Sequence, residues 1–370
     1  MRLVLPRGAN SDVTRFFEPY GVKIEYLDRM YAQHAAASLL DKLKRQWERI
    51  RSELEVYRYS RRNLAPNSIV HIEAAPWQSW ILLYLLSRRF NTIATVHNSI
   101  PAKDSTSRAP IWSWRMTFLL RQPRFQLFAA NQDAVESIRS YVPEAYWDKI
   151  SLTRAAINPF EIEQVLNAPF DRDGLLRKHG VPINRFIVLC VGQFIDRKGR
   201  WVFMEAAQQA RAAGNDLFFI WLGPEELSDA DIARIAEYDV EGYFRYVVSP
   251  SLGPKRSDVL TFFRVADVFI LASYLEGLPI SIIEALALGL PVISTNINAI
   301  PEAVTNLKTG LLIKPGYTLG LTEAIEKFHL DDKFRTEVSK AGQAFALETF
   351  DERLATAVVF DRYSRGLADA

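Results

Sequence analysis

The sequence predicts an α/β protein built from two Rossmann-like, doubly wound domains that face each other across a cleft. Short apolar runs of strand length alternate with helical segments along the chain, which indicates parallel sheets with crossover helices. The 370 residues suit two domains of ordinary size. A turn and a short helix near Asn158-Pro159 separate the two groups of strands. We therefore expect residues 1–160 and 161–350 to form the two domains.

Apolar runs too short for helices are expected to form the strands of both sheets. In the first domain these runs are residues 2–5, 22–26, 69–72, 92–96 and 126–130. In the second domain they are residues 186–191, 217–222, 245–248, 267–271 and 292–295.

The longest helix expected in the first domain covers residues 34–62. Its apolar side chains recur at spacings of three and four, so they form one stripe that we expect to pack into the core: Leu43, Trp47, Ile50, Leu54 and Tyr57. Basic residues cover much of the remaining surface and could dock on anionic lipid head groups, although a helix in solution has the same pattern. Residues 111–121 set tryptophans beside arginines, as at a membrane interface, but a buried helix is the favoured interpretation.

The formal net charge of +2 conceals an asymmetry along the chain. Residues 1–125 contain 20 Lys and Arg against 10 Asp and Glu, whereas residues 126–370 contain 25 against 33. The basic part suits an anionic membrane or a phosphorylated acceptor, and equally a solvated positive surface. The single cysteine, Cys190, lies in an apolar run and fits a reducing cytosol. No signal peptide or bilayer span is evident, so we expect a cytoplasmic protein, attached to the inner face of the plasma membrane if its basic part binds lipid.

The most informative stretch is residues 266–295, which predicts a strand, a helix and a second strand. A turn with Glu276 and Gly277 follows the first strand, and Pro279 suits the first turn of a helix that ends near Gly289. Such a unit is a right-handed crossover between parallel strands. Ligands of open parallel sheets bind at the carboxyl ends of the strands, which is where Glu276 is expected.

This turn has the chemistry of an anion site. The backbone N–H groups from Gly277 to Ile280 and the dipole of the following helix suit a diphosphate. Glu284 lies about one and a half turns along the helix and can accept hydrogen bonds from a ribose or sugar diol. The alternative is that both glutamates are solvated surface carboxylates.

The residues around the two glutamates favour a functional site. Glu276-Gly-Leu-Pro279, followed by Glu284-Ala-Leu-Ala-x-Gly-x-Pro-Val-Ile, closely resembles the donor-site signature of family 4 retaining glycosyltransferases, which have the GT-B fold. The resemblance covers residues 186–315 well and the first domain more weakly. It implies that Gly277, Leu278 and Pro279 bind the donor diphosphate, that Glu276 lies near the sugar hydroxyls, and that Glu284 binds the ribose.

A second loop, residues 191–199, follows the first strand of the second domain. Gly192 lets the chain turn sharply, and Arg197 and Lys198 place two cations close to the expected position of the first glutamate. Fixed cations stabilise the charge that develops on a diphosphate leaving group. The loop resembles the family's Gly-Arg…Lys-Gly loop, which grips the donor diphosphate. Lys198 matches the family lysine, but Gln193 replaces the arginine, so Arg197 substitutes for it or Gln193 donates a weaker, neutral hydrogen bond.

Three further segments carry weaker matches. Thr95-Val-His97-Asn98 resembles the family's Thr-x-His segment, which implies that His97 contacts the donor sugar near the reacting carbon. Pro301-Glu302 resembles a Pro-Glu element, but Asn298 and Ala299 replace the glycines that usually precede it, so we expect a reshaped loop. Residues 7–10 follow the first strand, where the fold often reaches the acceptor and the donor phosphates, but the loop is less glycine-rich than in the family.

Together these matches imply a retaining, metal-independent hexosyltransferase-type enzyme with His97, Glu276 and Lys198 as catalytic residues. The implied donor is a UDP-, GDP- or ADP-sugar, and the implied acceptor is a glycan or lipid-linked hydroxyl in bacterial surface polysaccharide or glycolipid synthesis. No cofactor, metal or nucleic acid is expected. Asp171-Arg-Asp173 imitates a metal-binding Asp-x-Asp but is expected to cap a helix.

Two alternatives stay open at this point. One is a nucleotide-sugar epimerase or hydrolase on the same fold, and the other is a non-catalytic partner protein, which the Gln193 departure slightly favours. In proteins of this fold a C-terminal helix commonly crosses back to the first domain, so residues 351–370 are expected to do so. The sequence names neither the donor base and sugar nor the acceptor.

Overall fold

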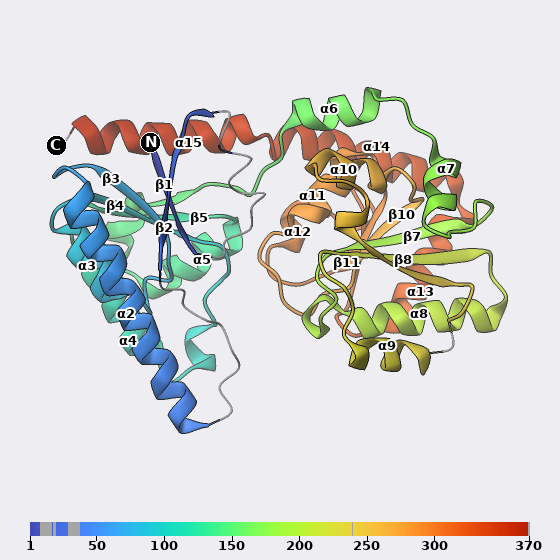
Figure 1. Cartoon of the computed structure of the whole chain (residues 1–370), viewed down its shortest axis with the longest axis horizontal. Coiled ribbons are helices and arrows are strands. Elements are labelled where there is room, and N and C mark those ends of the chain that lie inside the picture. The colour runs from blue at the N-terminus through green and yellow to red at the C-terminus, as the bar shows by residue number, and fades with distance from the viewer. Residues whose placement is uncertain (8–16, 18–19, 29–37, 239, 369–370) are drawn as a thin grey trace.

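The structure of the chain, a computed structural model, describes residues 1–7, 17, 20–28, 38–238 and 240–368. Two α/β halves lie side by side, and the C-terminal helix lies along the N-terminal half (Figure 1). All paired strands in the named sheets are parallel. The predicted α/β class with two parallel-sheet units is therefore confirmed. Residues 8–10 of the loop after the first strand lie outside the described residues.

The N-terminal half contains a four-stranded sheet and a separate strand pair. Its strands are β1 (Arg2–Pro6), β2 (Lys23–Leu27), β3 (Ile69–Glu73), β4 (Asn91–Val96), β5 (Phe125–Ala129) and β6 (Ile150–Leu152). Its helices are α2 (Leu39–Asn63), α3 (Trp80–Ser87), α4 (Ala109–Leu120) and α5 (Gln132–Tyr141), with 3-10 turns at Lys103–Ser105 and Glu144–Lys149. The sheet order is β3-β4-β5-β6, and β1 pairs with β2.

The C-terminal half contains one six-stranded sheet in the order β12-β11-β10-β7-β8-β9. Its strands are β7 (Phe186–Val191), β8 (Leu217–Gly223), β9 (Phe244–Val248), β10 (Val268–Leu271), β11 (Val292–Thr295) and β12 (Leu311–Ile313). Its first helices are α6 (Pro159–Asn167), α7 (Arg172–Lys178), α8 (Arg200–Ala213), α9 (Asp229–Ala236) and α10 (Arg256–Phe263). They are followed by α11 (Ile280–Ala287), α12 (Ile300–Ala303), α13 (Thr318–Leu330), α14 (Asp332–Thr349) and α15 (Glu352–Ala368), with 3-10 turns at Asp196–Lys198 and Ser249–Ser251.

The strand order of this sheet reverses between β7 and β10. The chain first builds outward from β7 to β9 and then starts again on the other side of β7 with β10. In open parallel sheets the loops part at such a point and leave a crevice beyond the carboxyl ends of the two strands. The loops after β7 and β10 carry the two most distinctive sequence motifs. Because both loops begin at this point of the sheet, the two motifs lie side by side.

The core beneath these strand ends is apolar. Every residue of β8 and of β10 is buried, and so are most residues of β7. Trp221 is fully buried and its indole N–H donates to the Gly192 carbonyl at 2.8 Å, which fixes the chain where it leaves β7. Cys190 is buried as expected, and burial raises the pKa of its thiol.

The prediction that the apolar stripe of α2 packs into the core is wrong, because most of the stripe is exposed. Leu43 and Trp47 are about three-fifths exposed, and Ile50 and Leu54 are 39% exposed. Only Tyr57 of the stripe packs against a small apolar cluster in the N-terminal half. The helix turns a polar face inward instead, where Arg49 donates to the Gln78 side chain at 3.4 Å. Periodicity identified the stripe but not the side of the helix that faces the protein.

The helix α4 agrees better with its interpretation as a buried helix. Met116, Leu119 and Leu120 are fully buried, whereas Ile111 and Trp114 remain exposed. None of the helices in the described part of the chain is long and apolar enough to span a bilayer.

The final helix ties the two halves together. Ile157 and Asp351 form an isolated parallel bridge where α15 begins. Farther along α15, the Tyr363 hydroxyl lies 2.5 Å from Nδ1 of His71 on β3. Thus α15 starts beside the C-terminal half and packs against the N-terminal sheet (Figure 1).

Candidate functional site

The candidate site is centred on the buried carboxylate of Glu276. Its side chain is 6% exposed, and Lys198 Nζ lies 2.7 Å from Oε1 while Arg197 Nη1 lies 3.3 Å from Oε2. The Ser273 hydroxyl donates to Oε1 at 2.8 Å. A buried carboxylate needs such partners because its desolvation is otherwise costly. The structure therefore brings together the glutamate and the two cations that the sequence placed at neighbouring strand ends.

The loops after β7 and β10 interlock through their backbones. Tyr274 N–H donates to the Arg197 carbonyl at 2.8 Å, and Arg197 Nη1 donates to the Leu275 carbonyl at 3.0 Å. Gly199 has φ of +73°, and a Cβ there would lie 2.0 Å from the Ala272 carbonyl oxygen. Only glycine fits both the left-handed conformation and this approach. Lys198 is consequently held at 14% exposure, while Arg197 is 42% exposed.

The substituted Gln193 has a different position. It is exposed to solvent directly after Gly192, which has φ of +153°. Arg197, by contrast, already lies on Glu276. The second cation of the cluster is Arg197, whereas the prediction that it replaces the family arginine on the diphosphate stays a prediction.

Asn298 explains how the chain does without a glycine before Pro301. It has φ of +44°, a left-handed conformation that glycine adopts freely and asparagine tolerates better than most residues. Its side-chain oxygen accepts from the Glu276 N–H at 3.5 Å, a long contact. The loop keeps a glycine-like backbone and gains a polar contact with the site.

Gly277 is the point where the two halves meet. A Cβ on Gly277 would lie 2.5 Å from the His97 carbonyl oxygen and 2.9 Å from Oδ1 of Asn98. The loop after β4 therefore lies against the turn that carries Glu276. Leu278 is 8% exposed and Pro279 is buried ahead of α11. The backbone of His97 lies against the Glu276 turn, and the predicted contact of its ring with the donor sugar stays a prediction.

His97 has an acidic partner that the sequence analysis did not identify. Its Nε2 lies 3.4 Å from Oε1 of Glu73, which ends β3. Hydrogen bonding to Glu73 raises the pKa of His97, and the same hydrogen bond lowers the pKa of Glu73. Glu73 is paired in register with Thr95, so the signal that could have found it is the adjacency of β3 and β4.

His71 lies on β3, beside the strand that leads to His97, and both of its ring nitrogens contact side chains of the protein. Its Nε2 is 2.6 Å from the Thr95 hydroxyl, and its other ring nitrogen faces Tyr363. Burial lowers the pKa of His71, so the neutral ring is favoured there. This ring supports the strand end that carries His97.

Glu284 meets an arginine on a neighbouring helix. Arg256, the first residue of α10, lies 2.5 Å from Oε1 of Glu284 and 3.2 Å from Oε2 of Glu161. Burial raises the pKa of Glu284 to about 7 despite this cation. Arg256 was not singled out from the sequence because it belongs to none of the recognised motifs, and its contact with Glu284 depends on how α10 packs beside α11.

The raised pKa of Glu284 gives a stability prediction. The folded protein holds the Glu284 proton more tightly than the unfolded chain does. The stability that this adds is fully present below the unfolded pKa and is lost as the pH rises through about 7. Glu284→Gln is therefore expected to raise the free energy of unfolding by roughly 1–3 kcal/mol near pH 8 and to change it little near pH 4.5. Urea denaturation at both pH values measures this, with the exposed Glu337→Gln as a matched control. Equal effects at both pH values would contradict the assignment.

Glu302 joins the two halves by capping a helix. Its Oε2 accepts from the Gln132 N–H at 2.8 Å and its Oε1 accepts from the Asp133 N–H at 2.9 Å. These are the first N–H groups of α5, which also favour negative charge through the helix dipole. The Glu302 side chain, from α12 of the C-terminal half, thus holds the N-terminal half in contact.

Asp171 has the helix-capping role expected from the sequence. It accepts from the Gly174 N–H at 2.8 Å and begins α7. The apparent Asp-x-Asp motif is explained by this cap.

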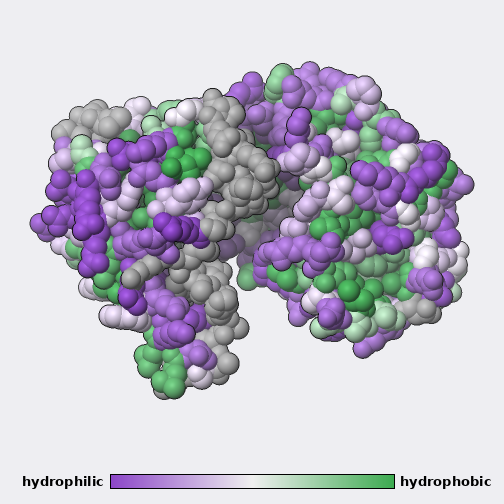
Figure 2. All heavy atoms as spheres, in the orientation of Figure 1, coloured by the Kyte–Doolittle hydropathy of each residue, from purple (hydrophilic) through white to green (hydrophobic). Residues whose placement is uncertain are grey.

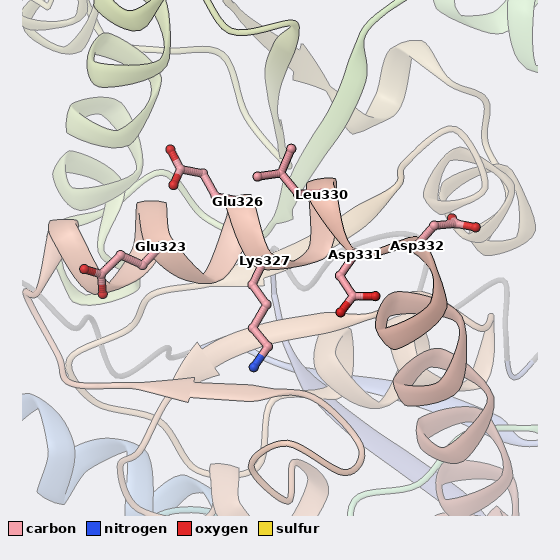
Figure 3. A pocket seen from close by; sticks show the side chains of 6 residues that line it. All are labelled: Glu323, Glu326, Lys327, Leu330, Asp331 and Asp332. Carbon is pink, nitrogen blue, oxygen red and sulfur yellow. The ribbon is translucent and has the colours of Figure 1, made fainter.

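A hollow of about 580 Å³ beside α13 has the wrong charge for a diphosphate. Its side chains point in different directions from the end of α13 and the start of α14, and four of the six are acidic (Figure 3). They are Glu323, Glu326, Lys327, Leu330, Asp331 and Asp332. The cationic cluster on Glu276 is the better anion site.

Comparison with known proteins finds a family model that matches most of the C-terminal half. Residues 171–345 match the family model described as glycosyl transferases group 1. The chain is 27% identical over 179 residues to the N,N'-diacetylbacillosaminyl-diphospho-undecaprenol alpha-1,3-N-acetylgalactosaminyltransferase of Campylobacter jejuni, which covers 48% of this chain and 44% of the relative. It is 28% identical over 192 residues to the lipopolysaccharide core biosynthesis glycosyltransferase LpsE of Rhizobium meliloti, with 52% of each chain covered. The chain therefore spans about half the length of the curated relatives it matches.

Solved structures match the chain over nearly its full length. A glycosyltransferase of Rickettsia africae has a TM-score of 0.73 at 18% identity, covering 99% of this chain and 90% of its own. Sucrose-phosphate synthase of Thermosynechococcus elongatus has a TM-score of 0.72 at 19% identity, with both chains covered completely. HepE of Anabaena, solved with UDP and glucose, has a TM-score of 0.69 at 16% identity over 98% of this chain and 91% of its own. At these identities the likeness shows the fold, which is GT-B.

Proposed function

Because residues 171–345 match the family model of the group 1 glycosyl transferases, we propose that the chain is a retaining, metal-independent glycosyltransferase. It transfers a sugar, of hexose type, from a nucleotide diphosphate-sugar to an acceptor hydroxyl in the synthesis of a bacterial surface polysaccharide or glycolipid. The observation that carries the proposal is the buried Glu276 with Lys198 and Arg197 on it, at the switch point of the C-terminal sheet.

The two cations are suited to hold the donor diphosphate. In this structure they neutralise the Glu276 carboxylate. When a donor binds, its phosphate oxygens take over these cations, and the carboxylate is released to accept hydrogen bonds from the sugar hydroxyls. N–H groups of the turn from Gly277 toward Ile280 add further donors to the diphosphate. Because negative charge grows on the diphosphate as the sugar bond breaks, Lys198 and Arg197 stabilise the transition state more than the ground state.

His97 faces the same turn from the N-terminal half and contacts the donor sugar. Glu73 holds its ring and favours the protonated form, which donates a hydrogen bond to a sugar hydroxyl or phosphate oxygen. In the front-face transfer implied by the family resemblance, the donor phosphate takes the acceptor proton. For this transfer the acceptor enters from the side of the N-terminal half. Contact between the halves excludes water from the reacting groups.

Glu284 is proposed to bind the ribose of the donor. Its partner Arg256 offsets the negative charge that the carboxylate brings into a buried position. A ribose diol would donate to the carboxylate oxygens, and Arg256 would then lie beside the nucleotide as well.

The comparisons support a class of donor and acceptor. HepE of Anabaena was solved with UDP and with UDP-glucose, which favours UDP among the candidate nucleotides. The printed name of the Campylobacter jejuni relative specifies a diphospho-undecaprenol substrate, which favours a lipid-linked acceptor. We accordingly place the reaction at the cytoplasmic face of the membrane.

Calorimetric titration with UDP, GDP and ADP tests the donor site. Binding of one nucleotide, followed by turnover of its sugar conjugates only when a polyprenyl-linked acceptor is present, is the expected result. Nucleotide release that does not depend on an acceptor would instead indicate a hydrolase. If no nucleotide binds, the chain is a non-catalytic partner and the proposal fails.

Glu302→Ala is expected to loosen the contact between the halves. The change leaves the first N–H groups of α5 without their carboxylate and removes a charge-assisted cap. We expect the specificity constant for transfer to fall by roughly tenfold while nucleotide affinity changes little, since misplacing reacting groups is costly. Steady-state kinetics and calorimetry measure the two effects, with the exposed Glu326→Ala as control. A loss of nucleotide affinity alone would place Glu302 in the donor site instead.

A further inference from the structure

The helix α2 presents an apolar stripe to solvent. Leu40 is 77% exposed, and it continues the stripe of Leu43, Trp47, Ile50 and Leu54. The spacing of three and four residues places these side chains in one row along the helix. Figure 2 shows a hydrophobic patch at the free end of α2, which projects from the N-terminal half, while the visible surface farther along the helix is largely hydrophilic.

The orientation of α2 is the reverse of that in a helix packed on a core. Its polar side chains Arg45, Glu48, Arg49 and Glu53 are half-buried, while the apolar stripe is exposed. Arg49 and Glu53 form an ion pair at 3.8 Å on this inner side, and burial raises the pKa of Glu53. A globular protein normally turns such a helix the other way. Among the described residues, the exposed stripe therefore has no apolar partner.

The charges beside the stripe identify the kind of partner. Among the described side chains of α2 from residue 42 onward, the exposed charged groups are all basic: Lys42, Lys44, Arg51, Arg58, Arg61 and Arg62. The acidic residues Glu48, Glu53 and Glu55 are partly buried. Asp41, at the start of the helix, is engaged in a capping box with Ser38. An apolar row flanked by cations, with a tryptophan in its middle, is typical of a helix that lies in a membrane interface.

We propose that this face of α2 binds the surface of an anionic lipid bilayer, with the helix lying in the interfacial plane. The apolar row enters the boundary between head groups and acyl chains, and the flanking Lys44, Arg51 and Arg58 reach lipid phosphates. The row from Leu40 to Leu54 is about 21 Å long at 1.5 Å per residue, which is long enough for a stable interfacial contact.

A second copy of the chain fits this face less well. The row has the spacing of a coiled-coil seam, so a helix pair is the obvious competitor. In a helix pair, the cations beside the apolar row of one copy would lie against the residues beside the apolar row of the other copy. On this helix those residues are Lys44, Arg51 and Arg58 on one side, and Gln46, the inward-turned Glu53 and the buried Ser60 on the other. No exposed carboxylate in these described positions would meet the cations, whereas lipid phosphates would.

The neighbouring helices extend the apolar character of this half. α2 packs on α3, which packs on α4. Ile81 of α3 is 54% exposed, and Trp114 of α4 is also 54% exposed. The surface supplies the attachment for the membrane location proposed above. Its test needs neither donor nor acceptor, so it can fail while the transfer reaction stands.

Vesicle flotation of the full chain tests the proposal. The vesicles consist of phosphatidylcholine alone, or of phosphatidylcholine with one third phosphatidylglycerol. We expect binding to the anionic vesicles only, weakened by added salt. Leu43→Ser with Trp47→Ser should lower the partition coefficient by about tenfold or more because apolar insertion is lost. Replacing Lys44, Arg51 and Arg58 by glutamine should remove the preference for anionic lipid.

The matched control is Leu319→Ser with Leu330→Ser, two exposed leucines on the C-terminal half. It should bind vesicles as the unmodified chain does, and circular dichroism should show that every variant is folded. Absence of binding by the unmodified chain would overturn the proposal, as would an apolar variant that binds equally well. So would sedimentation showing a dimer that the same apolar variant dissociates, because the face would then belong to a second copy.

Discussion

Lys198→Ala is expected to lower the specificity constant for sugar transfer by about 10³-fold, the largest loss from a single side chain that this structure predicts. Lys198 supplies the shorter of the two ion pairs to Glu276 and is far less exposed than Arg197. A cation held in such a position needs little reorganisation when charge develops on the diphosphate. Nucleotide affinity should also fall, by roughly one to two orders of magnitude, because a charge-assisted contact to phosphate is lost.

The design must separate catalysis from folding. Removing Lys198 leaves a buried carboxylate with Arg197 and Ser273 as its partners among the described side chains, which also costs stability. The double variant Lys198→Ala with Glu276→Gln removes that uncompensated charge. We expect it to regain thermal stability without regaining activity, while the exposed Lys340→Ala behaves as the unmodified chain. Calorimetry, kinetics and thermal denaturation supply the readouts, and a Lys198→Ala protein with normal nucleotide affinity would refute the diphosphate assignment.

The site was predictable where its residues follow strands that lie side by side in the sheet. Lys198 and Glu276 follow β7 and β10, and parallel strands bring their carboxyl ends to one edge. That rule needs only the strand assignments, which are secure in long apolar runs. Two short strands, β6 and β12, escaped prediction because three-residue runs carry no periodicity.

Partners that lie outside the recognised motifs were not predictable. Glu73 reaches His97 because β3 and β4 are in register, and Arg256 reaches Glu284 because α10 lies near α11. Such contacts depend on how elements pack, which a single sequence does not state. The same limit explains the error on α2, where the apolar row was correctly identified but was assigned to the wrong side. What a helix packs against is decided by its neighbours as well as by its own pattern.

Contact between the halves gives the second large prediction, because Gly277 leaves no room for a side chain. Its φ is not in the left-handed region, so alanine is compatible with the backbone. The obstacle is the His97 carbonyl oxygen, 2.5 Å from the position of an added Cβ. A backbone atom cannot rotate away as a side chain does. Gly277→Ala should therefore push the two halves apart at the site itself.

We expect Gly277→Ala to reduce sugar transfer by about 10²-fold, the cost of misplacing reacting groups by roughly an ångström. The Cβ would point toward the N-terminal half, so nucleotide affinity in the C-terminal half should change by only about threefold or less. Small-angle scattering should report a larger radius of gyration. Leu275→Ala, an exposed change in the same turn, serves as the control for disturbance of the turn. Normal turnover by Gly277→Ala would mean that catalysis does not require His97 and the Glu276 turn to meet. Loss of turnover with normal nucleotide binding would show that the donor site is complete in one half and the reaction needs both.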